Sequence, residues 1–486
     1  MSTRSSLAIL ALASVAFAAC SGPDGELARE QRALRGEDTL LVPDESERAA
    51  DLEASVDALL NPLVERNLVS GSILIAKGGE VLLAKGYGFA DREHRAANTA
   101  HTPFRLASLS KSVTAVAVLQ LVDKGLLDLG CTLEAFIPGF AHGERITVEH
   151  LLAHRSGIPS DVYLDGFREK SAQSITLEDA IDWVRKEARP RFEPGARFDY
   201  SNSGYLLLTS IVEKASGLPF EQYLAGNVFN PAGMTCSGLD SAALILAGRA
   251  RGYSRTELGE VTNAAYRDPS FGWGYGALYS TVLDLLNFDR ALMDGRLLSS
   301  ASRRMMWTAR SDTPWGNQYG LGWFVDDLDG NGVVIALGST GGYVATLRHF
   351  PADDTVVVVL LNHDFMLYEE LFDQLSLLAL GKQWKPILEH PASPAHGQLS
   401  ALVGTYEMDD GAFLKLRAVD GRLEFGDPRS EVFFEVFALS EREGYVPEQN
   451  AKLRFGESGE GEVELFALYG NLAWHGRRIP EAQREK

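Results

Sequence analysis

The chain lacks the residues and motifs that mark several common protein classes. Only three of its 486 residues are cysteine, too few for the disulfide framework of a small secreted domain. It contains neither the G-x-S-x-G elbow of α/β-hydrolases nor the H-E-x-x-H motif of zinc proteases, and its ten histidines show no metal-ligand spacing. The sequence therefore implies no metal and no organic cofactor.

Positive charge is also scarce. The chain has 46 Lys and Arg residues against 66 Asp and Glu residues, which gives a formal net charge of -20. Such a balance disfavours binding to nucleic acid and electrostatic docking to anionic lipid. We therefore expect a small-molecule or peptide substrate and no nucleic-acid partner.

The N-terminus carries an apolar run, Leu7 to Ala19, which follows Arg4. The run is too short to span a bilayer and ends in small residues, as a cleaved secretion signal does. The letters F-A-A-C, ending at Cys20, resemble the lipobox of bacterial lipoproteins, although Cys20 could also be incidental in a simple secretion signal. The resemblance implies lipidation of Cys20 and an exported protein held on a membrane by its lipid, on the periplasmic face, and on the outer membrane if two membranes are present.

Composition and periodicity predict a large enzyme domain followed by a small β domain. We expect a signal peptide at 1–20, a polar tether at 21–50, an enzyme domain at 51–384, a proline-containing linker at 385–397 and a β meander or barrel at 398–486. Helical apolar spacing begins at Asp51, two strands flank Gly78-Gly79, and strand-like segments return after a helix-rich middle. This order favours an α+β fold whose sheet is completed by pieces distant in sequence.

Ser108 and Lys111 lie three positions apart where an apolar helix begins. Residues three apart on a helix share a face, so Lys111 can reach the hydroxyl of Ser108, and a helix N-terminus favours the negative charge that develops there. The alternative is an N-capping serine beside a solvated lysine.

Two tyrosine-x-asparagine triplets occur. Tyr200-Ser201-Asn202 follows a Pro-Gly turn and precedes an apolar helix, where a tyrosine can relay a proton and an asparagine can bind an amide or ester dipole. Tyr469-Gly470-Asn471 lies between two strand-like stretches, and we interpret it as a hairpin turn.

Six stretches follow one another in the order of a known family: FRLASLSKSVTAVAVLQLVDKGLLDL, ITVEHLLAHRSGI, PGARFDYSNSGYLLL, NPAGM, GALYSTVLDLLNF and YGLGW. Over roughly residues 51–365 the chain resembles the serine β-lactamase and penicillin-binding protein family, most closely its class C and esterase-like branch. The resemblance implies a β-lactamase/DD-peptidase-like fold, in which a helical domain lies beside an antiparallel sheet flanked by helices and the active site lies between them.

The same resemblance assigns roles to single residues. Ser108 becomes the nucleophile of an acyl-enzyme, Lys111 its activating partner, Tyr200 a proton relay, and Asn202 a contact of the substrate and of Lys111. Backbone N–H groups of Ser108 and Ser339 would form the oxyanion hole. Whether Lys111 or Tyr200 deprotonates the serine stays open, and His154, within the second stretch, is interpreted as structural.

The third motif departs from the family pattern. Class C enzymes carry Lys-Thr-Gly at the edge strand of the site, and this chain has Ala336-Leu337-Gly338 before Ser339. The cation and hydroxyl that meet a substrate carboxylate are therefore missing, whereas the glycine and the backbone survive. We expect Leu337 to make the strand more apolar beside the site, and the change to favour neutral esters or amides over carboxylate-bearing β-lactams.

Three functions remain open at this stage. The first is a serine hydrolase acting through an acyl-enzyme on esters, amides or small peptides. The second is a β-lactamase or D-alanyl-D-alanine carboxypeptidase. The third is a catalytically degenerate relative that only binds a ligand, which the altered third motif favours and the intact Ser108, Lys111, Tyr200 and Asn202 argue against.

Overall fold

The computed structural model describes most of the enzyme region and eight strands after it. The described residues are 45–255, 261–364, 368–387, 400–408, 413–419, 422–428, 433–440, 442–446, 451–457, 463–469 and 472–479. The predicted signal peptide and Cys20 lie outside them. Within these ranges, we find no helix both long and apolar enough to cross a membrane.

An antiparallel sheet, whose strand order differs from the order along the chain, forms the centre of the enzyme region. Its strands follow one another in the order β10-β11-β12-β13-β14-β15-β1-β2, so strands from both ends of the region pair, as predicted. Strand β1 pairs with β15 from Gly71↔Leu361 to Lys77↔Thr355 and with β2 on its other side. The strands are β1 (Gly71–Lys77), β2 (Glu80–Tyr87), β10 (Ser311–Asp312), β11 (Gln318–Tyr319), β12 (Phe324–Leu328), β13 (Asn331–Thr340), β14 (Tyr343–Phe350) and β15 (Thr355–Leu361).

Helices cover both faces of this sheet. On one face, α2 (Glu45–Glu65) and α14 (Tyr368–Ala379) pack their apolar residues against alternate residues of the strands, such as Ile73, Val357 and Val359. On the other face, the core contains the remaining set, such as Leu74 and Val358, together with α3 (Ser110–Asp123) and α12 (Val282–Met293). Every residue of β15 is buried because both of its faces are covered, which explains its unbroken β-branched run.

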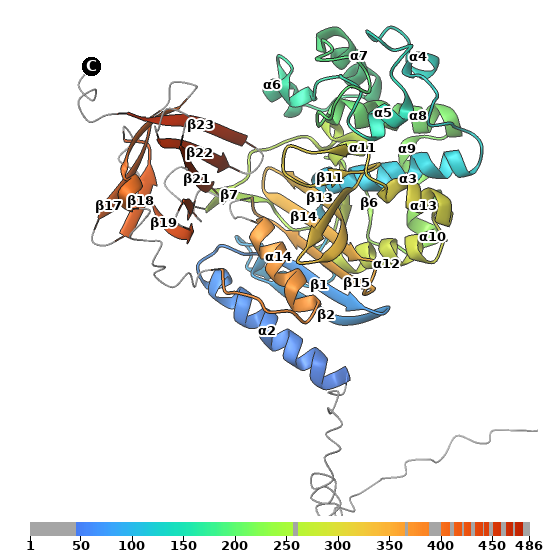
Figure 1. Ribbon diagram of the computed structural model, residues 1–486. Helices are drawn as coiled ribbons and strands as arrows, with labels where there is room; N and C mark the ends of the chain where they lie inside the picture. The colour runs from blue at the N-terminus through green and yellow to red at the C-terminus, as the bar shows by residue number, and fades with distance from the viewer. Residues whose placement is uncertain are drawn as a thin grey trace, which may run out of the picture. The chain divides into compact units, whose positions relative to one another are not determined.

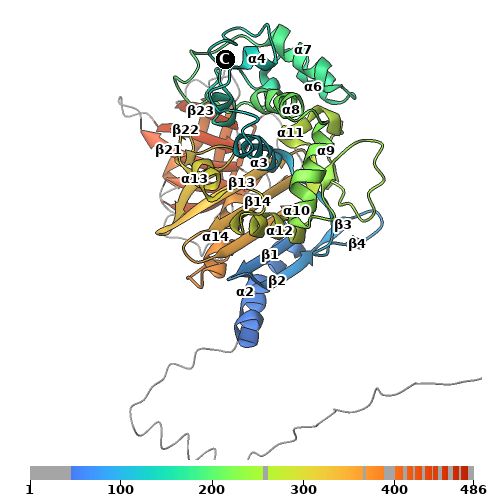
Figure 2. The same ribbon diagram turned by 90° about the vertical axis from the view of Figure 1, so that its right-hand side faces the viewer.

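The helical part contains the middle of the chain. In both views α4, α6 and α7 lie together at the end of the domain away from α2 (Figure 1, Figure 2). Its main helices are α3 (Ser110–Asp123), α4 (Leu133–Phe136), α5 (Val148–Leu152), α6 (Phe167–Ser171), α7 (Leu177–Glu187), α8 (Asn202–Ser216), α9 (Phe220–Leu224), α10 (Asn230–Ala232), α11 (Trp273–Gly276), α12 (Val282–Met293) and α13 (Ser300–Trp307). Helix α3 is buried from Ser110 to Leu121, so its all-round apolar sequence matches an all-round buried environment.

Two sequence expectations are refined here. Helix α2 begins at Glu45, so residues 45–50 of the expected tether are helical. The C-terminal region forms a closed eight-stranded barrel, where the sequence left a meander or a barrel open. Its strands are β16 (Gly404–Met408), β17 (Phe413–Val419), β18 (Arg422–Gly426), β19 (Phe433–Ser440), β20 (Glu443–Val446), β21 (Ala451–Glu457), β22 (Val463–Tyr469) and β23 (Leu472–Ile479). Strands β22 and β23 pair antiparallel as far as Tyr469↔Leu472, which fits the hairpin interpretation of this triplet; Gly470 and Asn471 themselves lie outside the described residues.

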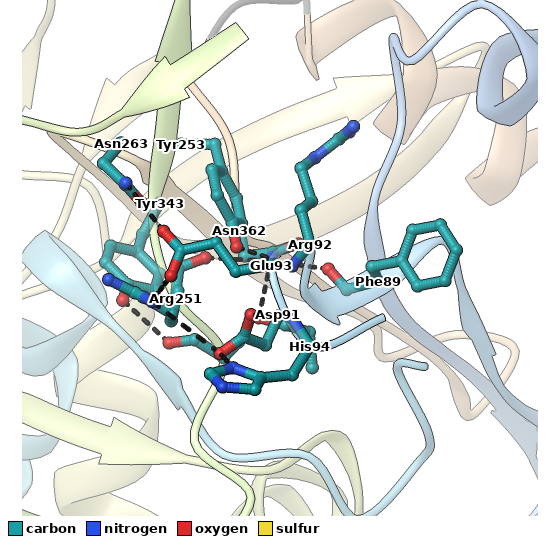
Figure 3. A network of polar contacts seen from close by, with 12 residues as sticks. Phe89, Asp91, Arg92, Glu93, His94, Arg251, Tyr253, Asn263, Tyr343 and Asn362 are labelled. Atoms are coloured by element: carbon teal, nitrogen blue, oxygen red, sulfur yellow. Dashed lines mark hydrogen bonds and ion pairs between the residues drawn. The ribbon is translucent and has the colours of Figure 1, made fainter. Parts of the chain in front are cut away.

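A polar network fixes the small β7–β8 hairpin (Tyr253–Arg255 and Val261–Asn263) beside the large sheet (Figure 3). The backbone N–H of Arg92 donates to the Tyr253 hydroxyl at 2.7 Å, and the Asn263 amide donates to Glu93 at 3.0 Å. Asn362 donates to the carbonyl oxygens of Phe89 and Arg251, both at 2.9 Å. Three chain segments distant in sequence are thereby joined.

The β7–β8 hairpin also contacts the turn that follows the third motif. Gly342, at φ +79°, lies so close to the hairpin that an added Cβ would be 2.6 Å from the Cβ of Ala264 and 2.7 Å from the Cα of Gly252. Only glycine combines that backbone conformation with so close an approach. The hairpin therefore holds the end of β13 and the start of β14 in place.

Candidate active site

The stretch around Ser108 forms a tight turn at the start of α3. Strand β5 (Phe104–Arg105) pairs with β9 (Leu278–Ser280), and a single 3-10 turn, η1 (Ala107–Leu109), follows before α3 begins. Ala107 has a φ of +48°, a left-handed conformation that non-glycine residues rarely adopt. Such backbone persists where the surroundings over-determine it, which is common at active sites.

Lys111 is almost completely buried, at 1% exposure, and its Nζ donates to Ser108 Oγ at 2.9 Å and to the carbonyl oxygen of Tyr275 at 3.1 Å. The ammonium position lies 4.9 Å from the ring centroid of Tyr200 and 5.3 Å from that of Tyr275. Burial among these rings lowers the pKa of Lys111 to about 7, although the carboxylate of Asp161 opposes the shift. Near neutral pH a large fraction of Lys111 is therefore an uncharged amine, which can accept a proton.

Tyr200 is also hydrogen-bonded to Ser108. Burial raises the pKa of Tyr200 well above its ordinary value, and the bond with Ser108 only partly opposes that shift. The phenol is therefore protonated at neutral pH. It can pass a proton onwards, but in the resting enzyme it is a poorer base than Lys111.

The ring of His154 packs against the ring of Tyr200. Its ring centroid lies 4.2 Å from that of Tyr200, and its Nδ1 accepts a hydrogen bond from the backbone N–H of Ser201 at 3.1 Å. Burial, and secondarily the charge of Lys111, lowers the pKa of His154 well below its ordinary value, so the ring is neutral. These contacts fit the structural interpretation of this histidine.

Asn202 is the first residue of helix α8, and its hydrogen bonds differ from the expectation. Its Nδ2 donates to Asp161 Oδ1 at 3.1 Å, whereas the hydrogen bonds of Lys111 go to Ser108 and Tyr275. The hydrogen bond that Asn202 makes here is to a buried carboxylate, whereas the expectation was a contact with Lys111. Within the described residues, Asn202 Oδ1 is buried and has no hydrogen-bond partner, which leaves an acceptor unused.

The third motif passes beside Ser108, along a strand edge that β12 does not cover. Strand β12 pairs with β13 only over Asn331–Ile335, so the edge of β13 from Ala336 to Thr340 is not covered by β12. A Cβ added at Gly338 would lie 2.1 Å from the carbonyl oxygen of Leu106 and 2.8 Å from the backbone nitrogen of Ser108. The backbones of Gly338 and Ser108 are thus in direct contact, as an oxyanion hole built from Ser108 and Ser339 would require.

The side chains of the third motif are arranged differently from the expectation. Ala336 is 1% exposed and belongs to the core cluster that contains α3, on the same face as Gly338. Leu337 packs against the opposite cluster, which contains α2 and α14. The expectation that Leu337 makes the site more apolar is therefore wrong, because neighbouring residues on a strand point to opposite faces.

Sequence analysis missed three residues that the fold brings to the site. Asp161 and Tyr275 are hydrogen-bonded to each other beside Lys111, with 2.6 Å between the Tyr275 hydroxyl and Asp161 Oδ2. Tyr368, the first residue of α14, is hydrogen-bonded to Ser339, and burial raises the pKa of Tyr368 to about 12. The only sequence signal for Asp161 was its position a few residues after the family-like LLAHRSGI stretch.

The fold is that of a serine hydrolase, and in its candidate site the buried Lys111 donates a hydrogen bond to Ser108. A family model described as Beta-lactamase matches residues 56–379. The chain therefore belongs to the Beta-lactamase family, which confirms the resemblance.

Individual relatives agree with this assignment. The putative penicillin-binding protein PbpX of Bacillus subtilis is 35% identical over 256 residues, which make up 53% of this chain and 62% of that protein, less than two thirds of its length. The octameric penicillin-binding protein homologue from Pyrococcus abyssi shares the fold with a TM-score of 0.64 and 26% identity, over 88% of this chain and 99% of that chain. A D-stereospecific amidohydrolase from Streptomyces has a TM-score of 0.54 and 25% identity, over 66% of this chain and 95% of that chain.

Proposed function

We propose that Ser108 forms an acyl-enzyme and that the protein hydrolyses esters, amides or small peptides. The observation that carries the proposal is the 2.9 Å hydrogen bond between Lys111 Nζ and Ser108 Oγ at a lysine whose pKa burial lowers to about 7. A neutral amine at hydrogen-bond distance from a serine hydroxyl is the arrangement that general-base activation requires. A protein that only binds its ligand has no need of it.

The reaction follows from these positions. Neutral Lys111 takes the proton of Ser108 as Oγ attacks the carbonyl carbon, and the N–H groups of Ser108 and Ser339 stabilise the resulting oxyanion. When the tetrahedral intermediate collapses, the bond to the leaving group breaks. Tyr200 donates its proton to the departing alcohol or amine and takes one from protonated Lys111. Water then attacks the carbonyl carbon of the acyl-enzyme and gives a proton to neutral Lys111. The bond between the acyl carbon and Ser108 Oγ breaks, Ser108 regains its proton from Lys111, and the acid is released.

Asn202 supports a substrate that carries an N–H group. Its Oδ1 is a buried acceptor without a partner among the described residues, and a buried unpaired acceptor costs free energy unless the ligand satisfies it. An amide N–H on the acyl side of the scissile bond would do so. Ala336 supports a neutral group on the other side, because it offers no charge to a carboxylate.

A β-lactamase or D-alanyl-D-alanine carboxypeptidase activity is the second candidate. Its support is the pair of penicillin-binding relatives, by their names. The substrates of such enzymes carry a carboxylate, and the alanine at 336 argues against tight binding of that group.

The test compares a soluble form that starts after Cys20 with its Ser108→Ala variant, on a short-chain aryl ester and on a chromogenic cephalosporin. We expect hydrolysis of the ester, little hydrolysis of the cephalosporin, and complete loss of both in Ser108→Ala. An intact-mass measurement should show an acyl adduct in the wild type only. Turnover that survives in Ser108→Ala would rule out Ser108 as the nucleophile, and absence of both turnover and adduct would favour the binding-only alternative.

We also propose that the protein is exported and lipid-anchored through Cys20. The proposal rests on the sequence pattern at residues 1–20. Replacing Cys20 by serine should move the protein from the membrane fraction to the soluble fraction, and the lipid mass should disappear from the N-terminal peptide. Membrane association that survives the substitution would contradict a Cys20 anchor.

A further inference from the structure

Asp161 is a buried acid that the reaction above does not use. It opens a short 3-10 turn, Asp161–Tyr163, and is 1% exposed. Its Oδ2 accepts from the Tyr275 hydroxyl at 2.6 Å, and its Oδ1 accepts from Asn202 Nδ2 at 3.1 Å and from the Ser160 hydroxyl at 3.3 Å. Since both oxygens are occupied by fixed protein donors, the carboxylate is poorly placed to accept a proton from water or substrate.

The first consequence concerns the orientation of Asn202. An amide side chain can turn either its oxygen or its nitrogen towards a site. The carboxylate of Asp161 can bond only to the nitrogen side of the amide, while the Ser160 hydroxyl holds the backbone N–H of Asn202 at 3.2 Å. The carboxylate therefore fixes Nδ2 towards itself and leaves Oδ1 as the acceptor offered to the substrate.

The second consequence concerns the charge of Lys111. The titratable groups that face Lys111 are Asp161, His154 and the three tyrosines at 200, 205 and 275. His154 is neutral, and burial raises the pKa of each tyrosine. Asp161 is the carboxylic acid in this set; burial raises its pKa, and the hydrogen bonds from Tyr275 and Asn202 and the charge of Lys111 oppose that shift. Its charge raises the pKa of Lys111, against the larger effect of burial.

We propose that Asp161 is a positioning residue of the acylation site, which orients Asn202 for an N–H of the substrate and sets the pH range in which Lys111 accepts a proton. The proposal rests on the proposed function. It extends that function by naming a residue that governs both acyl-group recognition and the pH dependence of acylation.

Two substitutions separate the two roles. Asp161→Asn removes the charge but keeps an oxygen that can accept from Asn202 Nδ2. Its acid limb of kcat/KM should move to lower pH, because loss of the nearby negative charge lowers the pKa of Lys111 and makes the free amine available at lower pH. Asp161→Ala should show the same movement and should also lose the orientation of Asn202.

A matched pair of substrates reports that orientation. The p-nitrophenyl esters of N-acetylglycine and of 4-oxopentanoic acid differ by one N–H replaced with CH2. For Asp161→Ala we expect kcat/KM to fall by about tenfold to a hundredfold on the N–H ester, the range for a lost hydrogen bond to a well-placed group. The fall on the CH2 ester should be smaller by a similar factor.

The control is another buried aspartate. Asp284, at 4% exposure, accepts from the backbone N–H of Cys236 at 2.6 Å and from the Ser237 hydroxyl at 2.7 Å. Asp284→Asn should lower the melting temperature without moving the acid limb or the ratio between the two esters. An unmoved acid limb in Asp161→Asn, together with equal losses on both esters in Asp161→Ala, would overturn the proposal and reduce Asp161 to a stabilising residue.

A measurement that needs no enzymatic activity separates failure of the proposed role of Asp161 from failure of the proposed function. In protein labelled with 15N-lysine, the Nζ signal of Lys111, identified by its loss in Lys111→Met, should titrate at a lower pH in Asp161→Asn than in the wild type. If neither ester is hydrolysed by the wild type, the proposed function fails on these substrates while this titration still decides the role of Asp161. Equal titration midpoints in the two proteins would refute the electrostatic role.

Discussion

Gly338 offers a direct test of whether β13 builds the oxyanion hole. A Cβ at this position would lie 2.1 Å from the Leu106 carbonyl oxygen, 2.7 Å from the Leu109 nitrogen and 2.8 Å from the Ser108 nitrogen. All three are backbone atoms, so no side chain can rotate away. Because non-bonded carbon atoms are comfortable at about 3.5 Å or more, Gly338→Ala must separate β13 from the nucleophile turn by about 1 Å.

The consequences for rate and stability differ in size. Displacement of one oxyanion donor typically lowers kcat by about a hundredfold to a thousandfold, and a misplacement of about 1 Å in a reacting geometry costs about a hundredfold. The overpacking itself destabilises by about 1–3 kcal/mol. We therefore expect a folded variant with a slightly lower melting temperature and a rate reduced by at least a hundredfold.

The assay is kcat/KM on the aryl ester, paired with thermal unfolding. Gly332→Ala is the matched control, because Gly332 lies on the same strand and a Cβ there meets no atom within 4 Å. It should keep the wild-type rate. If Gly338→Ala hydrolyses the ester within about twofold of Gly332→Ala, the strand does not supply an oxyanion donor and the reasoning is wrong.

The remaining predictions concern Lys111 and position 336. Wild-type kcat/KM should rise with pH through a midpoint of about 7, the pKa of Lys111, and Lys111→Met should abolish turnover. The pKa of Lys111 is lower in the folded chain than the 10.5 of a free lysine, so the unfolded state binds more protons between these two values. The free energy of unfolding of the wild type should therefore rise with pH from about 7 to about 10.5. Urea unfolding should show that this rise is absent in Lys111→Met. Ala336→Lys should increase the ratio of cephalosporin to ester hydrolysis by about tenfold or more. It should also lower the melting temperature, because residue 336 is 1% exposed. An unchanged ratio in a folded variant would contradict the argument that residue 336 sets the substrate class.

Short patterns in the sequence predicted the helices and strands that depend mainly on neighbouring residues. The Gly78-Gly79 hairpin, the all-apolar helix after Ser110 and the β-branched run of β15 each carry a signal within a few residues, and the structure contains all three. The sequence also predicted that one sheet is completed by strands distant in sequence. The pairing of β1 with β15 is such a case, although the sequence did not indicate which strands are neighbours.

The contacts that complete the site come from long-range packing, which a single sequence does not encode in any short pattern. Asp161 meets Tyr275, which is 114 positions away along the chain, and Tyr368, the first residue of α14, meets Ser339 on β13. A lone aspartate in a loop is usually a solvated charge, so nothing in its neighbourhood marked it as buried. Leu337 was misplaced for a related reason, since the face it takes depends on the register of β13 with β14.

The charges of the site can be understood together from the environment of Lys111. Burial drives its pKa down, and a second ammonium at position 336, on the face of β13 that packs towards α3, would drive it down further. Asp161 acts in the opposite direction. With alanine at 336, burial and one negative charge leave the pKa of Lys111 at about 7, where the lysine is both a usable base and a usable proton donor. Ala336→Lys should therefore move the acid limb to lower pH, as Asp161→Asn does, and the two substitutions combined should move it further than either alone, because both change the same charge balance around one amine.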